Sequence, residues 1–132
     1  MASDPALAAD VFARCCESRR TMLDITGRWG TLVLVALGDG THRFGELRRR
    51  IDGVSERMLS QTLQQLERDG FVARDVRATV PPHVEYRLTE LGSRFAQHLR
   101  GLIELVQDAM PEVIAAQERY DSAHRAKLVS AD

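Results

Sequence analysis

The 132 residues of this chain are enough for one domain with extended ends. With 44% hydrophobic and 28% charged residues, the composition argues against a disordered chain, and no apolar run approaches the roughly 18 residues of a membrane span. The net charge of −1 neither favours nor excludes nucleic acid as a partner, and the acidic start MASDPALAAD lacks the basic flank of a signal peptide, so we expect a cytoplasmic protein.

Residues 1–26 are predicted to form an N-terminal helical arm. The stretch from Leu7 to Met22 has a modest apolar face, made by Leu7, Val11 and Phe12. We expect this face to take part in a dimer interface.

Two adjacent cysteines, Cys15 and Cys16, lie in this arm. Neighbouring cysteines seldom pair with each other because the ring they would close is strained, which excludes a disulfide framework within one chain. They also lack the spacing of two to four residues that metal ligands favour. We therefore predict no metal site and no cofactor.

Residues 27–88 read as three helices followed by strand, loop and strand. The apolar run Thr31–Leu37 predicts a buried helix, which ends at the glycines of GDG. THRFGELRRRI predicts a short helix with Phe44, Leu47 and Ile51 on one face.

The third helix, SERMLSQTLQQLERDG, has the clearest boundaries. Ser55 is a good N-cap, and Gly70 suits the position after the helix. Three leucines form the apolar face: Leu59, Leu63 and Leu66. The opposite face carries Arg57, Gln61, Gln64, Gln65 and Arg68. A solvated outer face is one interpretation, but Gln, Ser, Thr and Arg reach base edges, whereas ordinary outer faces favour Glu and Lys.

FVARDVRA and HVEYRL alternate as strands around a loop that contains Pro81 and Pro82. The prolines stiffen the turn, so the hairpin would project as a rigid finger. This order of elements is that of a winged helix-turn-helix: a mostly α fold with a small β-hairpin.

Residues 89–120 are predicted to form C-terminal dimerisation helices, with Thr89 as the first cap and Pro111 as a kink or restart. A continuous apolar stripe needs a partner helix from a second chain, and its members include Leu99, Leu102, Val106, Met110 and Val113. Residues 121–132 are predicted to be a flexible tail.

The stretches FGELRRRIDGVSERMLSQTLQQLERDGFVAR and VPPHVEYRLTELG, preceded by GRWGTLVLVALGDG, resemble the HxlR-type winged-helix transcriptional regulators of bacteria. The resemblance covers roughly residues 16–100. It implies a homodimeric DNA-binding regulator, usually acting near its own promoter, and from it we expect repression rather than activation. Many members carry a cysteine at the position of Cys16 relative to Trp29, and in some it senses oxidants or electrophiles. Glu17, Thr26 and Arg28 depart from the family pattern around this cysteine and the Gly-Gly-Lys-Trp stretch.

The polar face and the resemblance together predict that Ser55–Asp69 enters the major groove of double-stranded DNA. Arg57 would contact guanine, and Gln61 or Gln65 adenine. Ser55 would lie on a phosphate. Two neighbours have alternatives in packing: Met58, which could touch a thymine methyl, and Thr62 at the side of the face.

Contacts to the DNA backbone are expected from the preceding helix and from the hairpin. The candidates are Arg43, Arg48, Arg49, Arg77, Thr79 and His83. A solvated charge run for the helix arginines and an ordinary loop histidine remain the alternatives. A two-fold dimer would bind a pseudo-palindrome.

The signal has two candidates. Cys16, and with it Cys15, would become reactive if Arg19 or Arg20 lowered the thiol pKa, and a small electrophile would then be the partner. Inert packing is the alternative. A pocket between the N-terminal helix, Trp29 and the dimer helices would instead bind a small planar effector.

Two other classes of function have less support in the sequence. The sequence contains no phosphate-binding Gly-rich loop, paired-carboxylate cluster or nucleophile with a suitably spaced base, so we predict that it is not an enzyme. A winged-helix module that binds protein rather than DNA is the main alternative, and aromatic or aliphatic anchors on the outer face of 55–68 would favour it.

Overall fold

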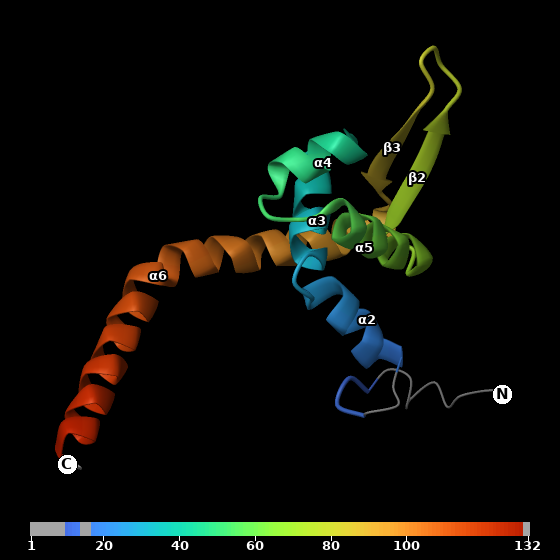
Figure 1. Ribbon diagram of the computed structural model, residues 1–132. Coiled ribbons are helices and arrows are strands. Elements are labelled where there is room, and N and C mark those ends of the chain that lie inside the picture. Colours follow the sequence, from blue (N-terminus) through green and yellow to red (C-terminus); the bar gives the residue numbers. More distant parts are fainter. Residues whose placement is uncertain (1–9, 14–16, 131–132) are drawn as a thin grey trace. The chain divides into compact units, whose positions relative to one another are not determined.

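The computed structural model describes residues 10–13 and 17–130. Two compact units divide the chain, Met1–Leu99 and Arg100–Asp132. The elements, in chain order, are α2 (Glu17–Thr26), α3 (Gly30–Leu37), β1 (His42–Arg43), α4 (Phe44–Arg50), α5 (Glu56–Arg68), β2 (Val72–Arg77), β3 (His83–Leu88) and α6 (Glu90–Ser130) (Figure 1).

The core of the first unit is built around α3, which is apolar on every side and packs against α2, α4, α5 and β3. The largest fully buried side chains are Val33, Leu34, Leu47, Leu59, Leu63 and Leu66. Each such side chain contributes about 1.5–3 kcal/mol through burial. Because half of them come from α5, the helix with the polar outer face is firmly anchored.

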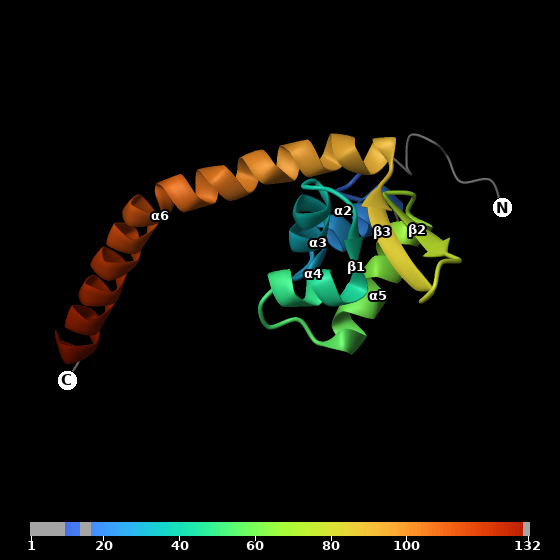
Figure 2. The same ribbon diagram turned by 90° about the horizontal axis from the view of Figure 1, so that it is seen from above.

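The sheet has three antiparallel strands in the order β1-β3-β2, which Figure 2 shows side by side. The predicted hairpin is confirmed, with Val72 opposite Leu88 and Arg77 opposite His83. The prediction of only two strands is wrong, because His42 and Arg43 pair with the middle strand. The added strand joins the base of the hairpin to the helices, and Figure 1 shows the tip extending beyond them.

The hairpin is joined to α6 through a tight contact. Thr89 caps the helix as predicted: its Oγ1 accepts from the Gly92 N–H at 3.0 Å and donates to the Gly70 carbonyl at 2.6 Å. A Cβ on Gly92 would overlap the Phe71 carbonyl group, so only glycine allows this approach. The rings of Phe71 and Phe95 then pack with centroids 4.7 Å apart.

Three predictions about the ends of the chain need correction. Residues 11–13 form a turn, not the helix predicted from Leu7 to Met22, and the described helix begins at Glu17. Leu7, Cys15 and Cys16 lie outside the described residues. At the other end α6 runs without a restart through Pro111, and it continues to Ser130.

The flexible tail predicted for 121–132 is therefore wrong over 121–130. This segment contains Ala, Arg, Lys and Leu and neither Gly nor Pro, so its residues favour a helix.

The described part of the second unit, 100–130, is the rest of α6. Its apolar stripe is exposed in this chain, at Leu102, Leu105, Val106, Met110, Val113 and Ile114. Leu99 differs from the predicted interface residues, because it is only 8% exposed and belongs to the core of the first unit. No described helix has the length and apolarity to cross a membrane.

Candidate DNA-binding surface

Helix α5 begins and ends as the sequence predicts. The Ser55 Oγ accepts a hydrogen bond from the Met58 N–H at 3.1 Å, which is a side-chain N-cap. Gly70, with φ of +85°, takes the left-handed position just past the helix. Both ends of α5 are thus defined by capping residues, and the same side chains remain on its outer face.

That face is polar and open. At 100° per residue, the positions opposite the buried leucines carry exposed side chains: Arg57, Gln61, Gln64, Gln65 and Arg68. No aromatic or aliphatic anchor lies among them, so the feature that would favour a protein-binding helix is missing from this face.

One edge of α5 meets the α2–α3 connection. Met58 is 40% exposed there, and the Thr62 hydroxyl donates to the Met58 carbonyl at 2.8 Å. These two side chains border a hollow of about 210 Å³, hereafter the Trp29 hollow, whose lining also includes Asp24, Arg28, Trp29, Gln61 and Gln65. The Thr62 hydroxyl proton is therefore already donated within α5.

The Trp29 hollow is also lined by Arg28, a basic residue that was not predicted to contact DNA. The Arg28 guanidinium lies over the Trp29 ring, 5.0 Å from its centroid. The far edge of the same ring faces the turn before α5, 3.7 Å from the position that a Cβ on Gly53 would occupy. Trp29 thus holds Arg28 beside the start of α5. The cue in the sequence was the Arg-Trp pair itself.

The arginines in α4 and on either side of it differ in their pairing. Arg48 contacts Glu56 at 3.3 Å, and Arg50 contacts Asp39. Within the described residues, Arg43, Arg49 and Arg57 make no ion pair, so their charges are unneutralised. Glu46, which accepts from the Arg43 N–H at 2.9 Å, serves as a backbone cap.

In the β2–β3 hairpin, hereafter the wing, two arginines and a histidine lie against carboxylates. Arg77 Nε lies 3.1 Å from Glu85, and Arg87 Nε lies 2.8 Å from Asp75. His83 Nε2 contacts Glu85 at 3.0 Å, and the Thr79 hydroxyl donates to the Pro81 carbonyl at 3.0 Å. Hydrogen bonding to His83, and next to Arg77, lowers the pKa of the Glu85 carboxyl.

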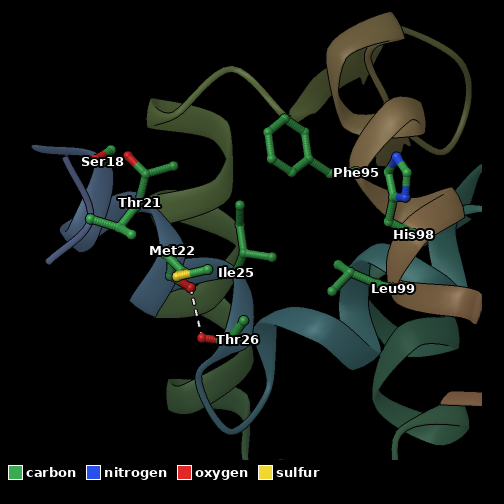
Figure 3. A pocket seen from close by; sticks show the side chains of 9 residues that line it. Ser18, Thr21, Met22, Ile25, Thr26, Phe95, His98 and Leu99 are labelled. Atoms are coloured by element: carbon green, nitrogen blue, oxygen red, sulfur yellow. Dashed lines mark hydrogen bonds between the residues drawn. The ribbon is translucent and has the colours of Figure 1, made fainter. Parts of the chain in front are cut away.

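The apolar pocket lies elsewhere than predicted. A hollow of about 430 Å³ lies between α2 and the first turns of α6, and Trp29 is not among its lining residues (Figure 3). Its walls are Val11, Ser18, Thr21, Met22, Ile25, Thr26, Phe95, His98 and Leu99. Trp29 packs against the core and borders the more polar hollow instead. Among the described residues, no group of three or more His, Cys, Asp or Glu side chains could hold a metal ion.

Comparison with known proteins identifies this architecture. Residues 24–114 match the HxlR-like helix-turn-helix family. The chain belongs to the HxlR-like family. Across 109 residues this HxlR-like chain is 50% identical to YtfH of Escherichia coli K12, an uncharacterised helix-turn-helix-type transcriptional regulator, with 83% of this chain and 86% of YtfH covered.

Two solved structures extend the comparison. YtfH from Salmonella typhimurium, a transcriptional regulator, superimposes with a TM-score of 0.78 at 50% identity, covering 83% of this chain and 97% of that one. The redox regulator HypR in its oxidised form gives 0.65 at 36% identity, covering 70% and 96%. The HxlR-like chain is thus a transcriptional regulator of the helix-turn-helix type, and the predicted winged helix-turn-helix fold is confirmed. The family also confirms that it is a regulator and not an enzyme.

Proposed function

We propose that this regulator is a homodimeric repressor that binds a pseudo-palindromic operator near its own promoter. The observation that carries the proposal is α5: a helix capped at Ser55, anchored by three buried leucines and exposing Arg and Gln side chains along its outer face. A helix of this kind fits the major groove, where the four base pairs differ in their donors and acceptors.

Base recognition is assigned to the exposed face. Arg57, exposed and without an ion pair in the described part of the chain, would donate two hydrogen bonds to guanine. Gln61 and Gln65, one turn apart, would bond the adenine edge. Met58 is exposed enough to meet a thymine methyl.

Backbone contacts would frame this face. On one side lie Arg43, which precedes α4, and Arg48 and Arg49 within α4; on the other lies the wing with Arg77, Thr79 and His83. The structure supports adding Arg28, because Trp29 holds it at the edge of the hollow shared with Gln61 and Gln65. Phosphate contacts of this kind set affinity and register and carry little base preference.

The dimer would form through apolar side chains that are exposed because they are not part of the core of their own chain. Phe12, 90% exposed, and Val11 supply the N-terminal part. Leu102, Val106, Met110 and Val113 supply the C-terminal part. A contiguous apolar stripe of this size marks an interaction site. In a two-fold dimer, the two α5 helices would meet half-sites separated by about one helical turn, or a multiple of it.

The releasing signal is assigned to Cys16, with Cys15 beside it, or to a small effector. Similarity to HypR, a redox regulator, supports the thiol, and the nearby Arg19 and Arg20 are exposed on α2. The apolar hollow between α2 and α6, with His98 as a polar group at its wall, supports an effector that is small and largely apolar. Trp29 is not part of this second assignment.

The proposal is tested by titrating labelled duplexes with the protein. Wild type should bind the DNA upstream of its own gene more tightly than a scrambled duplex. Arg57→Ala should reduce that preference by about 1–3 kcal/mol, whereas Arg94→Ala, which removes an exposed arginine of α6, should preserve it. Equal binding of Arg57→Ala and wild type to both duplexes would refute the assignment. If wild type bound neither duplex, a protein-interaction module would be the better function.

A further inference from the structure

Two acidic side chains meet where α2 packs against α5. Asp24 lies near the end of α2, and Asp69 follows the last residue of α5. Among the described residues, Asp24 Oδ2 and Asp69 Oδ2 are the buried side-chain oxygens that have no hydrogen-bond donor. Two ionised carboxylates cannot satisfy each other, because neither has a proton to donate. One proton added to the pair creates the missing hydrogen bond.

The surroundings favour that proton. Burial, the hydrogen bond with Asp24 and the charge of Asp24 raise the pKa of Asp69 to about 6. Arg68, whose Nη1 lies 4.0 Å from Asp69, and Arg20 on α2 act in the opposite direction without cancelling the effect.

The other packed elements add little opposing charge. Helix α3, which packs against both helices, has no ionisable side chain. Strand β2, which packs against α5, carries Arg74, Asp75 and Arg77, of which the last two are engaged with Arg87 and Glu85. Arg28 shares the Trp29 hollow with Asp24, and its guanidinium lies over the Trp29 ring.

We propose that Asp24 and Asp69 form a proton-operated clasp that joins α2 to the recognition helix and makes DNA binding depend on pH. The proton comes from solvent, is shared between the two carboxyls, and returns to solvent when the clasp opens. No other reactant takes part. This regulation rests on the proposed function, because it acts on the helix assigned to base recognition.

The place of the pair explains why DNA binding would respond. Asp69 lies one turn beyond Gln65, and Asp24 lies four residues before Arg28. Asp24 also lines the Trp29 hollow together with Arg28 and Gln65. Repulsion between two carboxylates would push apart the two walls of this hollow, which carry groups assigned to the DNA. The shared proton keeps the two walls of the hollow packed together.

The sign follows from the raised pKa. Asp69 has a higher pKa in the folded chain, about 6, than its ordinary value of 3.8. Its contribution to stability is therefore full below pH 3.8 and is lost as the pH rises through about 6. Between pH 5 and pH 7.5, the linkage predicts a rise of about tenfold in the unfolding constant.

The test compares Asp69→Asn with wild type in urea unfolding at pH 5 and pH 7.5. Asparagine donates the hydrogen bond at every pH, so the unfolding constant of this variant should not show the tenfold rise between pH 5 and pH 7.5. Glu67→Gln, which removes an exposed carboxylate two residues earlier on α5, should behave as wild type. If Asp69→Asn does not fold, Asp24→Asn provides the same test from the other side. Parallel changes in wild type and the variant would overturn the clasp.

The second readout is affinity for the upstream duplex at both pH values. Raising the pH should weaken wild type relative to Asp69→Asn, by no more than the tenfold of the linkage. A stability difference without an affinity difference would overturn the regulatory part. If wild type bound no DNA at either pH while the stability difference remained, the clasp would stand and the proposed function would fail.

Discussion

Replacing Arg28 with alanine should weaken DNA binding without unfolding the protein. The guanidinium is exposed, makes no ion pair within the described residues, and contacts the Trp29 ring at 5.0 Å. A cation–π contact at an exposed site contributes about 0.5–1 kcal/mol, so the loss of folding stability should stay within that range.

The effect on DNA should appear in the salt dependence. One phosphate contact changes the slope of log K against log salt by about 0.9. Between 50 and 200 mM salt, one such contact accounts for about a three- to fourfold change in affinity. The ratio of wild-type affinity to Arg28→Ala affinity should therefore be about three- to fourfold larger at 50 mM salt than at 200 mM salt.

Fluorescence anisotropy with the upstream duplex and a scrambled duplex, at several salt concentrations, measures this slope directly. Arg28→Lys keeps the charge and should retain the wild-type slope. Arg94→Ala removes an exposed arginine of α6 and should also retain it. Because the contact is to backbone, both duplexes should lose affinity alike. An unchanged slope in Arg28→Ala would refute the assignment of this residue to a phosphate.

Two further predictions concern the wing and the thiols. Glu85→Gln removes the carboxylate that contacts Arg77 and His83, so it should tighten DNA binding and steepen the salt slope by up to about one unit, as measured by the same anisotropy titration; an unchanged slope would mean that Arg77 does not reach the DNA. Hydrogen bonding lowers the pKa of Glu85, so these wing contacts are present above its ordinary value of 4.5 and are lost as the pH falls through the lower folded value. Diamide should weaken DNA binding by wild type but not by Cys16→Ser, as followed by gel shift with reduced and oxidised protein; equal binding by oxidised and reduced wild type would leave the effector hollow as the switch.

The three central helices could be predicted from the sequence because their cues are local. The run Thr31–Leu37 is too apolar to be anything but buried, and Ser55 and Gly70 mark the two ends of α5. Strand β1 could not be predicted, because His42 and Arg43 are only two residues with no alternating pattern. They become a strand only because β3 offers a free edge next to them.

At the C-terminal end of the chain, local cues were present but misleading. Small and charged residues after Tyr120 suggested fraying, yet the same residues favour a helix once one has started. Pro111 suggested a kink or a restart, and α6 continues through it without a restart. The composition after Tyr120 was given more weight than the continuity of a long helix.

The outer face of α5 followed from periodicity, but its neighbours did not. The Trp29 hollow and the clasp bring Arg28 and Asp24 against residues some 30 to 45 positions later in the sequence. Such contacts depend on how α2 and α3 pack on α5, and no spacing in the sequence encodes them. The polar face could therefore be predicted, while the cation beside it and the carboxyl pair beneath it required the structure.

Ion pairing, more than the number of arginines, decides where DNA should bind most strongly. Acidic partners occupy Arg48, Arg50, Arg77 and Arg87. In the described part of the chain, Arg28, Arg43, Arg49 and Arg57 have no such partner, and all four lie on or beside α4 and the first turns of α5. Four unneutralised arginines are thus gathered at and beside the helix-turn-helix, whereas among the wing arginines only Arg74 has no such partner within the described residues. Substitutions at these four positions should therefore reduce affinity more than substitutions at Arg77 or Arg87, which must first leave a carboxylate before they can bind a phosphate.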